Sequence, residues 1–81
     1  MVVYILFSEI RSRYYIGQTI NIAERLERHN GGRVISTKSG VPWDLVYQIP
    51  VSDRSHALRL EQKIKKRGAK RFLEDLAKKD L

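Results

Sequence analysis

Glu61 is the residue whose position most suggests chemistry, because the sequence places a carboxylate on an apolar face. At 100° per residue, Glu61 falls near the middle of a helical arc formed by Ala57, Leu58, Leu60 and Ile64. A carboxylate facing a core is costly unless a cation, a metal or hydrogen-bond donors meet it. Two interpretations follow. Either Glu61 pairs with an arginine or lies at the rim of a rotated helix, or it binds a hard cation such as Mg²⁺.

A second polar pair lies earlier in the chain. Arg25 and His29 are four residues apart, so they share one face of a helix, at the edge of the arc formed by Ile22 and Leu26. An arginine fork suits a phosphate oxygen, and an imidazole can move a proton near neutral pH. Such pairs also occur as ordinary surface residues, so the spacing alone leaves both interpretations open.

Tyrosines form the third group. Strand alternation places Tyr14 and Ile16 on one face and Tyr15 and Gly17 on the other. A phenol has an unperturbed pKa of about 10, so a tyrosine acting as a base at neutral pH needs nearby positive charge. Gly17 would let a backbone or a phosphate approach closely. The alternative for each strand tyrosine is a place in the core.

Three strands and three helices must position these residues. Apolar, β-branched and aromatic runs predict strands over residues 2–7, 14–17 and 45–49, the first of them buried on both faces. A capping pattern opening at Asn21 and the Gly31-Gly32 pair bound the first helix. A second helix is expected from Ser52 or Asp53 to Gly68, and a third over residues 69–77. Residues 32–40 read as a loop with room for one helical turn.

Composition narrows the class of protein. The chain has 81 residues, 42% of them hydrophobic, which predicts one domain over residues 1–81 with a thin core. The absence of cysteine excludes disulfides and thiolate zinc sites. The longest apolar run, residues 2–7, is too short for a membrane helix and lacks a basic leader. We expect a soluble, cytoplasmic protein with no membrane partner.

Charge points to a polyanionic partner. Sixteen Lys or Arg residues against nine Asp or Glu give a net charge of +7, and ten of the sixteen lie between residues 54 and 79. The alternative is a solvated helical face that only maintains solubility. The exposed cations expected to contact nucleic acid are Arg28, Arg33, Lys38, Lys63, Lys65, Lys66, Arg67, Lys70 and Arg71.

Taken in order, these residues resemble the GIY-YIG endonuclease superfamily over nearly the whole chain. The matching set is Tyr4, then Tyr15-Ile16-Gly17-Gln18-Thr19, then Asn21, Arg25, Leu26, His29 and Asn30, and finally Ala57-Leu58, Glu61, Ile64 and Lys65. The likeness is greatest to small bacterial members that consist of this domain alone.

The resemblance implies an α/β sandwich, with a small three-stranded antiparallel sheet flanked by helices in the order β-β-α-β-α-α. It also implies a nuclease that uses one Mg²⁺ or Mn²⁺ per active site and cuts one strand there. Glu61 would hold the metal, and Arg25 would bind the scissile phosphate. Tyr4 and Tyr15 would be the paired tyrosines, His29 would assist one of them or contact phosphate, and Gly17 would shape the site.

The sequence departs from the family pattern at three places. Val2-Val3-Tyr4 lacks the leading glycine of the first motif, and Gln18 stands where excision-repair relatives carry a lysine. No asparagine follows Glu61, although some restriction-type relatives have one that supports the site. In a protein with this one domain, residues 31–40 and the basic helices would have to select the substrate. That favours cleavage selected by DNA structure over cleavage selected by DNA sequence.

The leading hypothesis is a metal-dependent endonuclease that nicks branched, nicked or otherwise distorted DNA, as in DNA repair. One alternative is a non-catalytic nucleic-acid-binding module of the same fold. Another is a small subunit that docks on a partner through the apolar strip of the last helix. The sequence leaves open whether RNA is cut, which tyrosine is the base, and whether the chain is a monomer or a weak dimer.

Overall fold

The computed structural model describes residues 1–79 and confirms the predicted order of elements. In chain order these are β1 (Val2–Ser8), β2 (Arg13–Thr19), α1 (Ile22–Asn30), η1 (Ile35–Gly40), β3 (Asp44–Pro50), α2 (Arg54–Arg67) and α3 (Ala69–Lys79). The segment 32–40, for which the sequence predicts a loop with room for one helical turn, contains the six-residue 3₁₀ helix η1.

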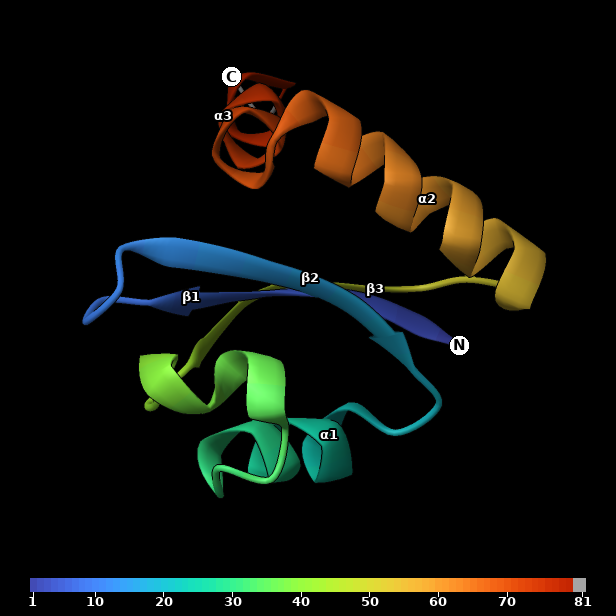
Figure 1. Cartoon of the computed structure of the whole chain (residues 1–81). Helices are drawn as coiled ribbons and strands as arrows, with labels where there is room; N and C mark the ends of the chain where they lie inside the picture. Colours follow the sequence, from blue (N-terminus) through green and yellow to red (C-terminus); the bar gives the residue numbers. More distant parts are fainter. Residues whose placement is uncertain (80–81) are drawn as a thin grey trace.

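The fold is an α/β sandwich around one antiparallel sheet. Its strand order is β2-β1-β3, so β1 is the central strand. Figure 1 shows α1 and η1 on one face of the sheet and α2 and α3 on the other. Because helices cover both faces, β1 is buried almost throughout, as its unbroken apolar sequence predicts.

Alternation along β1 divides the core into two clusters. Val3 and Ile5 point toward α2 and α3, where Ala57 and Ile64 are fully buried with them. Tyr4 and Leu6 point the other way and pack with Trp43, beneath α1. Burying these side chains is the main favourable term available to so small a domain. The same alternation fixes which strand residues can meet α1 and which can meet α2.

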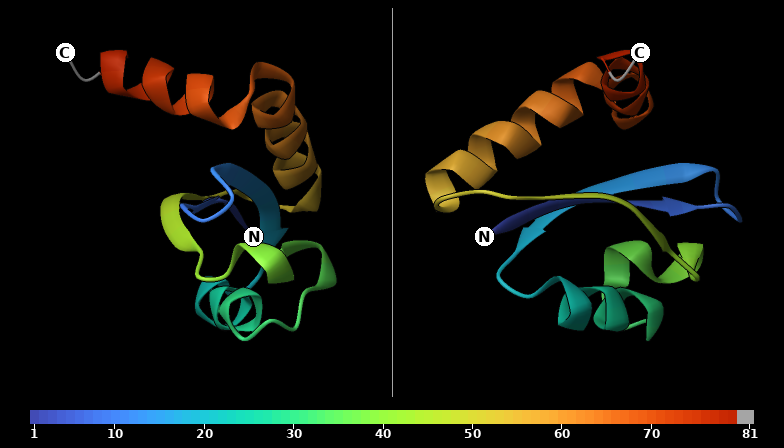
Figure 2. Two further views of the ribbon diagram at one scale, coloured as in Figure 1. Left: turned by 60° about the vertical axis from the view of Figure 1, so that its left-hand side comes forward. Right: turned by 180° about the vertical axis from the view of Figure 1, so that it is seen from behind.

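Local sequence sets the helix ends as predicted. The Asn21 side chain accepts a hydrogen bond of 3.1 Å from the Glu24 amide at the start of α1. The Asp53 side chain accepts one of 2.8 Å from the His56 amide at the start of α2. Gly68 has φ +92°, a conformation that favours glycine, and α3 leaves there in a new direction (Figure 2).

The inward face of α2 is narrower than predicted. Leu58 is 48% exposed, so its expected place in the core is wrong. The buried arc centres on Ala57 and Ile64, with Leu60 half-buried at one side. Removing Leu58 from the arc shifts its centre, which moves Glu61 from the middle to the rim. Within residues 1–79, no helix is long and apolar enough to cross a membrane.

Candidate active site

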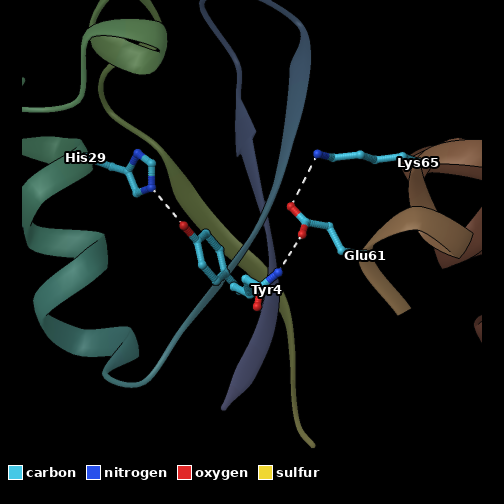
Figure 3. A network of polar contacts seen from close by, with 5 residues as sticks. Tyr4, His29, Glu61 and Lys65 are labelled. Atoms are coloured by element: carbon cyan, nitrogen blue, oxygen red, sulfur yellow. Dashed lines mark hydrogen bonds and ion pairs between the residues drawn. The ribbon is translucent and has the colours of Figure 1, made fainter. Parts of the chain in front are cut away.

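A buried tyrosine–histidine pair lies between β1 and α1. Tyr4 Oη is 3.0 Å from His29 Nε2 (Figure 3), and neither side chain is more than 1% exposed. Alternation turns Tyr4 toward α1, and the i,i+4 spacing from Arg25 turns His29 back toward the sheet. The structure therefore brings together two residues that are 25 positions apart in the sequence.

Thr37 of η1 contacts the other ring nitrogen of His29. Its hydroxyl lies 2.8 Å from His29 Nδ1 and 3.3 Å from the Val34 carbonyl, to which it can donate. A hydroxyl that donates to the carbonyl accepts from Nδ1–H. On this basis we assign the Nδ1–H tautomer of the neutral imidazole, which leaves Nε2 as the acceptor for the Tyr4 hydroxyl. Thr37 could not be identified from the sequence, because no pattern in residues 32–40 shows which side chain turns inward.

Both members of the pair are uncharged near neutral pH. Burial lowers the pKa of His29, and the nearby charges of Arg25 and Arg28 lower it further. Burial raises the pKa of Tyr4, an effect that the adjacent Arg25 partly offsets. The phenol thus keeps its proton, and the imidazole keeps a lone pair to receive it.

Tyr15 and Gly17 complete this side of the sheet. The ring centroid of Tyr15 is 4.9 Å from that of His29 and 6.3 Å from that of Tyr4. A Cβ atom at position 17 would lie 2.5 Å from Tyr4 Oη. The group that approaches Gly17 closely is therefore the Tyr4 side chain. Any residue with a side chain at position 17 of β2 would collide with the Tyr4 hydroxyl.

Arg25 lies beside both tyrosines with an unused donor. Its Nε atom is buried and has no hydrogen-bond partner, and contact with Tyr4 raises the pKa of its guanidinium. A cavity of about 290 Å³ adjoins it at the start of α1, with Thr19 and Arg28 also in its lining. A buried donor without a partner costs about 1–3 kcal/mol, so a ligand that supplies an acceptor gains that energy.

Glu61 lies on the other side of the sheet, at the rim of the α2 arc. Its side chain is 14% exposed, and its oxygens contact Gln18 Nε2 at 2.9 Å and Lys65 Nζ at 3.2 Å. The ion pair is thus with a lysine one turn away, and no arginine of the described chain pairs with it. Gln18 Oε1 is buried beside it with no hydrogen-bond partner.

The donors around Glu61 suit a hard cation bound through few protein ligands. Residues 1–79 contain no group of three or more histidine, aspartate or glutamate side chains that could enclose a metal. Mg²⁺ commonly uses one or two carboxylates and fills its shell with water and phosphate. The unpartnered Gln18 oxygen is a second hard donor next to Glu61. The competing Lys65 side chain is 58% exposed, and such surface pairs are weak, so a cation can displace it.

The two sides meet at the edge strand β2. Tyr4 points toward α1, whereas Glu61 comes from α2 (Figure 3). The pKa of Tyr4 is raised mainly by burial, and the charge of Glu61 adds to that increase. Gly17 faces Tyr4 and the next residue, Gln18, binds Glu61, so β2 connects both groups.

The predicted nucleic-acid contacts are all exposed but occupy two separate layers. Those on the α1 side are Arg28, Arg33 and Lys38, and those on the α2 and α3 side are Lys63, Lys65, Lys66, Arg67, Lys70 and Arg71. Arg67 is engaged by Asp75 through two hydrogen bonds of 2.8 and 3.0 Å. Lys65 is engaged by Glu61.

Comparisons with known proteins identify the family of this chain. The family model of the GIY-YIG catalytic domain matches residues 1–74. The chain is 43% identical over 63 residues to a protein of Cryptosporidium parvum named structure-specific endonuclease subunit SLX1 homolog, covering 72% of this chain and 15% of that protein. It is 40% identical over 52 residues to a UPF0213 protein of Sodalis glossinidius, covering 63% of this chain and 49% of that protein.

The chain thus spans less than half the length of either relative. No solved structure matches it significantly. The family match runs through both halves of the site described above, from β1 through α2 and into α3. The chain belongs to the GIY-YIG nuclease family.

Proposed function

We propose that this protein is a metal-dependent endonuclease that hydrolyses phosphodiester bonds in branched or distorted DNA. Family membership supports the nuclease chemistry. The name of the Cryptosporidium relative, a structure-specific endonuclease subunit, supports DNA structure as the feature selected. One Mg²⁺ or Mn²⁺ per site is the proposed cofactor.

The unpartnered Nε of Arg25 is the observation that carries this proposal. It is a buried, permanently charged donor beside two phenols, and nothing in residues 1–79 accepts its hydrogen bond. A phosphate oxygen is the acceptor that an arginine binds best. Arg25 would bind the scissile phosphate and stabilise the negative charge that grows on it during attack.

Tyr4 and His29 would remove the proton of the attacking water. As the water oxygen bonds to phosphorus, its proton passes to Tyr4 Oη, and the phenolic proton passes to His29 Nε2. The Tyr4–His29 distance of 3.0 Å allows that transfer without rearrangement. The step ends with neutral Tyr4 and protonated His29. The bond from phosphorus to the leaving oxygen breaks, and that oxygen takes a proton from solvent.

Glu61 and Gln18 would hold the cation. Glu61 Oε1 would exchange Lys65 for it, and Gln18 Oε1 would supply a neutral oxygen. When bound, the cation supplies Lewis-acid chemistry that polarises a phosphate oxygen. Gln18 Nε2 meanwhile keeps its hydrogen bond to Glu61 Oε2, which fixes the carboxylate plane.

A nicking assay with Mg²⁺ on nicked, flapped, four-way and continuous duplex DNA tests the proposal. Glu61→Gln should lower the cleavage rate at least about 100-fold, and Arg25→Ala about 10²–10³-fold, with DNA binding retained. Glu74→Gln and Arg59→Ala make the same changes at exposed positions on α3 and α2 and should cut normally. Equal rates in all four variants would refute the site. Salt-sensitive binding without turnover on any substrate would favour the non-catalytic module.

A further inference from the structure

A second polar cavity lies on the same face as the tyrosine–histidine pair. It has a volume of about 200 Å³ and lies between β2 and η1. Figure 1 shows η1 beneath the end of the sheet where the β1–β2 connection lies. None of the roles described above accounts for this cavity.

The rim of the cavity is cationic. Arg11 and Arg13 line it, both are exposed, and no acidic residue contributes to its lining. Neither arginine forms an ion pair within residues 1–79. Two unpaired guanidinium groups at one opening favour a ligand with a phosphate, which they can bind through paired hydrogen bonds.

The interior is aromatic and carries hydroxyl groups. Tyr15 and Trp43 line it with their ring centroids 6.3 Å apart, together with Ser36 and Ser39 of η1. The Trp43 indole N–H already donates to the Thr37 carbonyl at 2.7 Å, and the residue is 6% exposed, so Trp43 offers the cavity a small apolar surface and no free donor. A flat base next to an aromatic ring, with hydroxyls for its polar edge, suits such a lining.

The walls are already fixed before any ligand binds. The Asn30 side chain accepts from the Trp43 amide at 2.6 Å and donates to the Trp43 carbonyl at 3.1 Å. A Cβ atom at position 40 would lie 2.8 Å from Cε2 of the indole. Glycine at that position therefore leaves the space that the Trp43 ring occupies. Binding therefore requires little ordering of the pocket, which favours affinity.

The cavity joins the active site through Tyr15. Arg13 and Tyr15 lie two residues apart on the same face of β2, and two strand residues span about 7 Å. That separation is close to one step along a nucleic-acid strand. We propose that this pocket holds one unpaired nucleotide next to the scissile phosphate, with its phosphate on Arg11 and Arg13 and its base against Tyr15 and Trp43. The proposal rests on the proposed function and names the substrate as DNA with a single-stranded segment at the cleavage point.

An NMR titration of the full chain without metal tests the pocket independently of cleavage. The probes are a six-nucleotide oligothymidine and an abasic chain of the same length and charge. The oligothymidine should bind about tenfold tighter and shift the Trp43 indole N–H and the amides of Ser36 and Ser39. The variant Arg11→Gln/Arg13→Gln should lose this preference. Arg54→Gln/Lys78→Gln, an equal charge change at exposed positions, should keep it.

Equal affinity for the two probes, or shifts centred away from η1, would overturn the pocket. An equal loss of preference in both double variants would do the same, because charge alone would then explain it. Failure of the proposed function has a different signature. A chain that cuts no DNA but still shows the base-dependent shifts would retain the nucleotide pocket and lose the hydrolytic role.

Discussion

The two sides of strand β2 place their functional groups in contrasting ways. On the α1 side, Tyr4, His29 and Thr37 are fully buried and are joined by hydrogen bonds of 3.0 and 2.8 Å. On the α2 side, Glu61 is partly exposed, Gln18 has an oxygen without a partner, and the ion pair to Lys65 lies at the surface.

This difference matches the tasks we propose for each side. Proton transfer needs donor and acceptor at hydrogen-bond distance before the reaction starts, and on the α1 side Tyr4, His29 and Thr37 already make these contacts. A cation that arrives with phosphate and water needs ligands that can exchange, so the α2 side keeps weak contacts. We therefore call the Tyr4, His29 and Thr37 group the rigid side of the sheet, and the Glu61, Gln18 and Lys65 group the adaptable side.

Removing the Tyr4 hydroxyl should lower the cleavage rate more than any other change, because it removes the hydrogen bond between Tyr4 and His29. Tyr4→Phe removes the group proposed to accept the water's proton, and we expect cleavage to fall about 10²–10⁴-fold. It also leaves His29 Nε2 buried without a donor, which should cost about 1–3 kcal/mol of unfolding free energy. Single-turnover nicking and urea unfolding measure these two quantities.

Tyr47→Phe is the matched control, since Tyr47 packs on Phe72 of α3, on the opposite face of the sheet. A Tyr4→Phe enzyme as fast as Tyr47→Phe would exclude the phenol from the reaction.

Thr37 tests whether the tautomer of His29 matters. Thr37→Val has the same shape but no acceptor for Nδ1–H, so we expect cleavage to fall about 10–100-fold. Thr37→Ser keeps the acceptor and should restore most of the rate. Nitrogen-15 chemical shifts of the imidazole report the tautomer directly, and they should change in Thr37→Val alone. Unchanged shifts in that variant would contradict the assignment of the Nδ1 proton.

Lowering the pH should reduce the free energy of unfolding through the buried His29. Because the pKa of His29 is lowered in the folded chain, the unfolded chain binds a proton at about pH 6.5 while the folded chain does not. The unfolded state thus gains protons first, and stability present above about pH 6.5 is lost as the pH falls below it. Urea unfolding between pH 7.5 and 5 measures this loss.

His29→Gln should abolish the loss of stability, and His56→Gln on the exposed start of α2 should retain it. An NMR titration of His29 in the parent chain gives the same information if the variant is too unstable. A His29 that titrates above pH 6.5 would reverse the expected sign.

The smallest change is expected on the adaptable side. Lys65→Gln removes a surface ion pair, so the unfolding free energy should change by no more than about 1 kcal/mol. The same substitution removes a cation that competes at Glu61, so less Mg²⁺ should be needed for half-maximal cleavage. Lys66→Gln removes the neighbouring charge without touching Glu61 and is the control. A higher Mg²⁺ requirement in Lys65→Gln would show that Lys65 assists the site.

The sequence predicted the elements because they rest on local patterns. Alternation on β2 placed Tyr15 and Gly17 on one face, and the i,i+4 spacing placed Arg25 and His29 on one face of α1. Tyr4 entered the candidate site only through the family resemblance, because no pattern in the unbroken apolar run of β1 distinguishes it. Thr37 and the Gln18–Glu61 hydrogen bond could not be predicted, because they depend on how η1 and α2 pack across the sheet. The exposure of Leu58 was missed for the same reason, since propensity does not fix the rotation of a helix.

The central claim is that Glu61 gives up Lys65 for a hard cation at the edge of β2. Titration of the protein with Mn²⁺, followed by paramagnetic broadening of NMR signals, tests it most directly. We expect the Gln18 side-chain amide and the Gly17 backbone amide to broaden first, the His29 ring signals at higher occupancy, and none of these in Glu61→Gln. Broadening that begins elsewhere on the chain, or that is identical in Glu61→Gln, would contradict the claim.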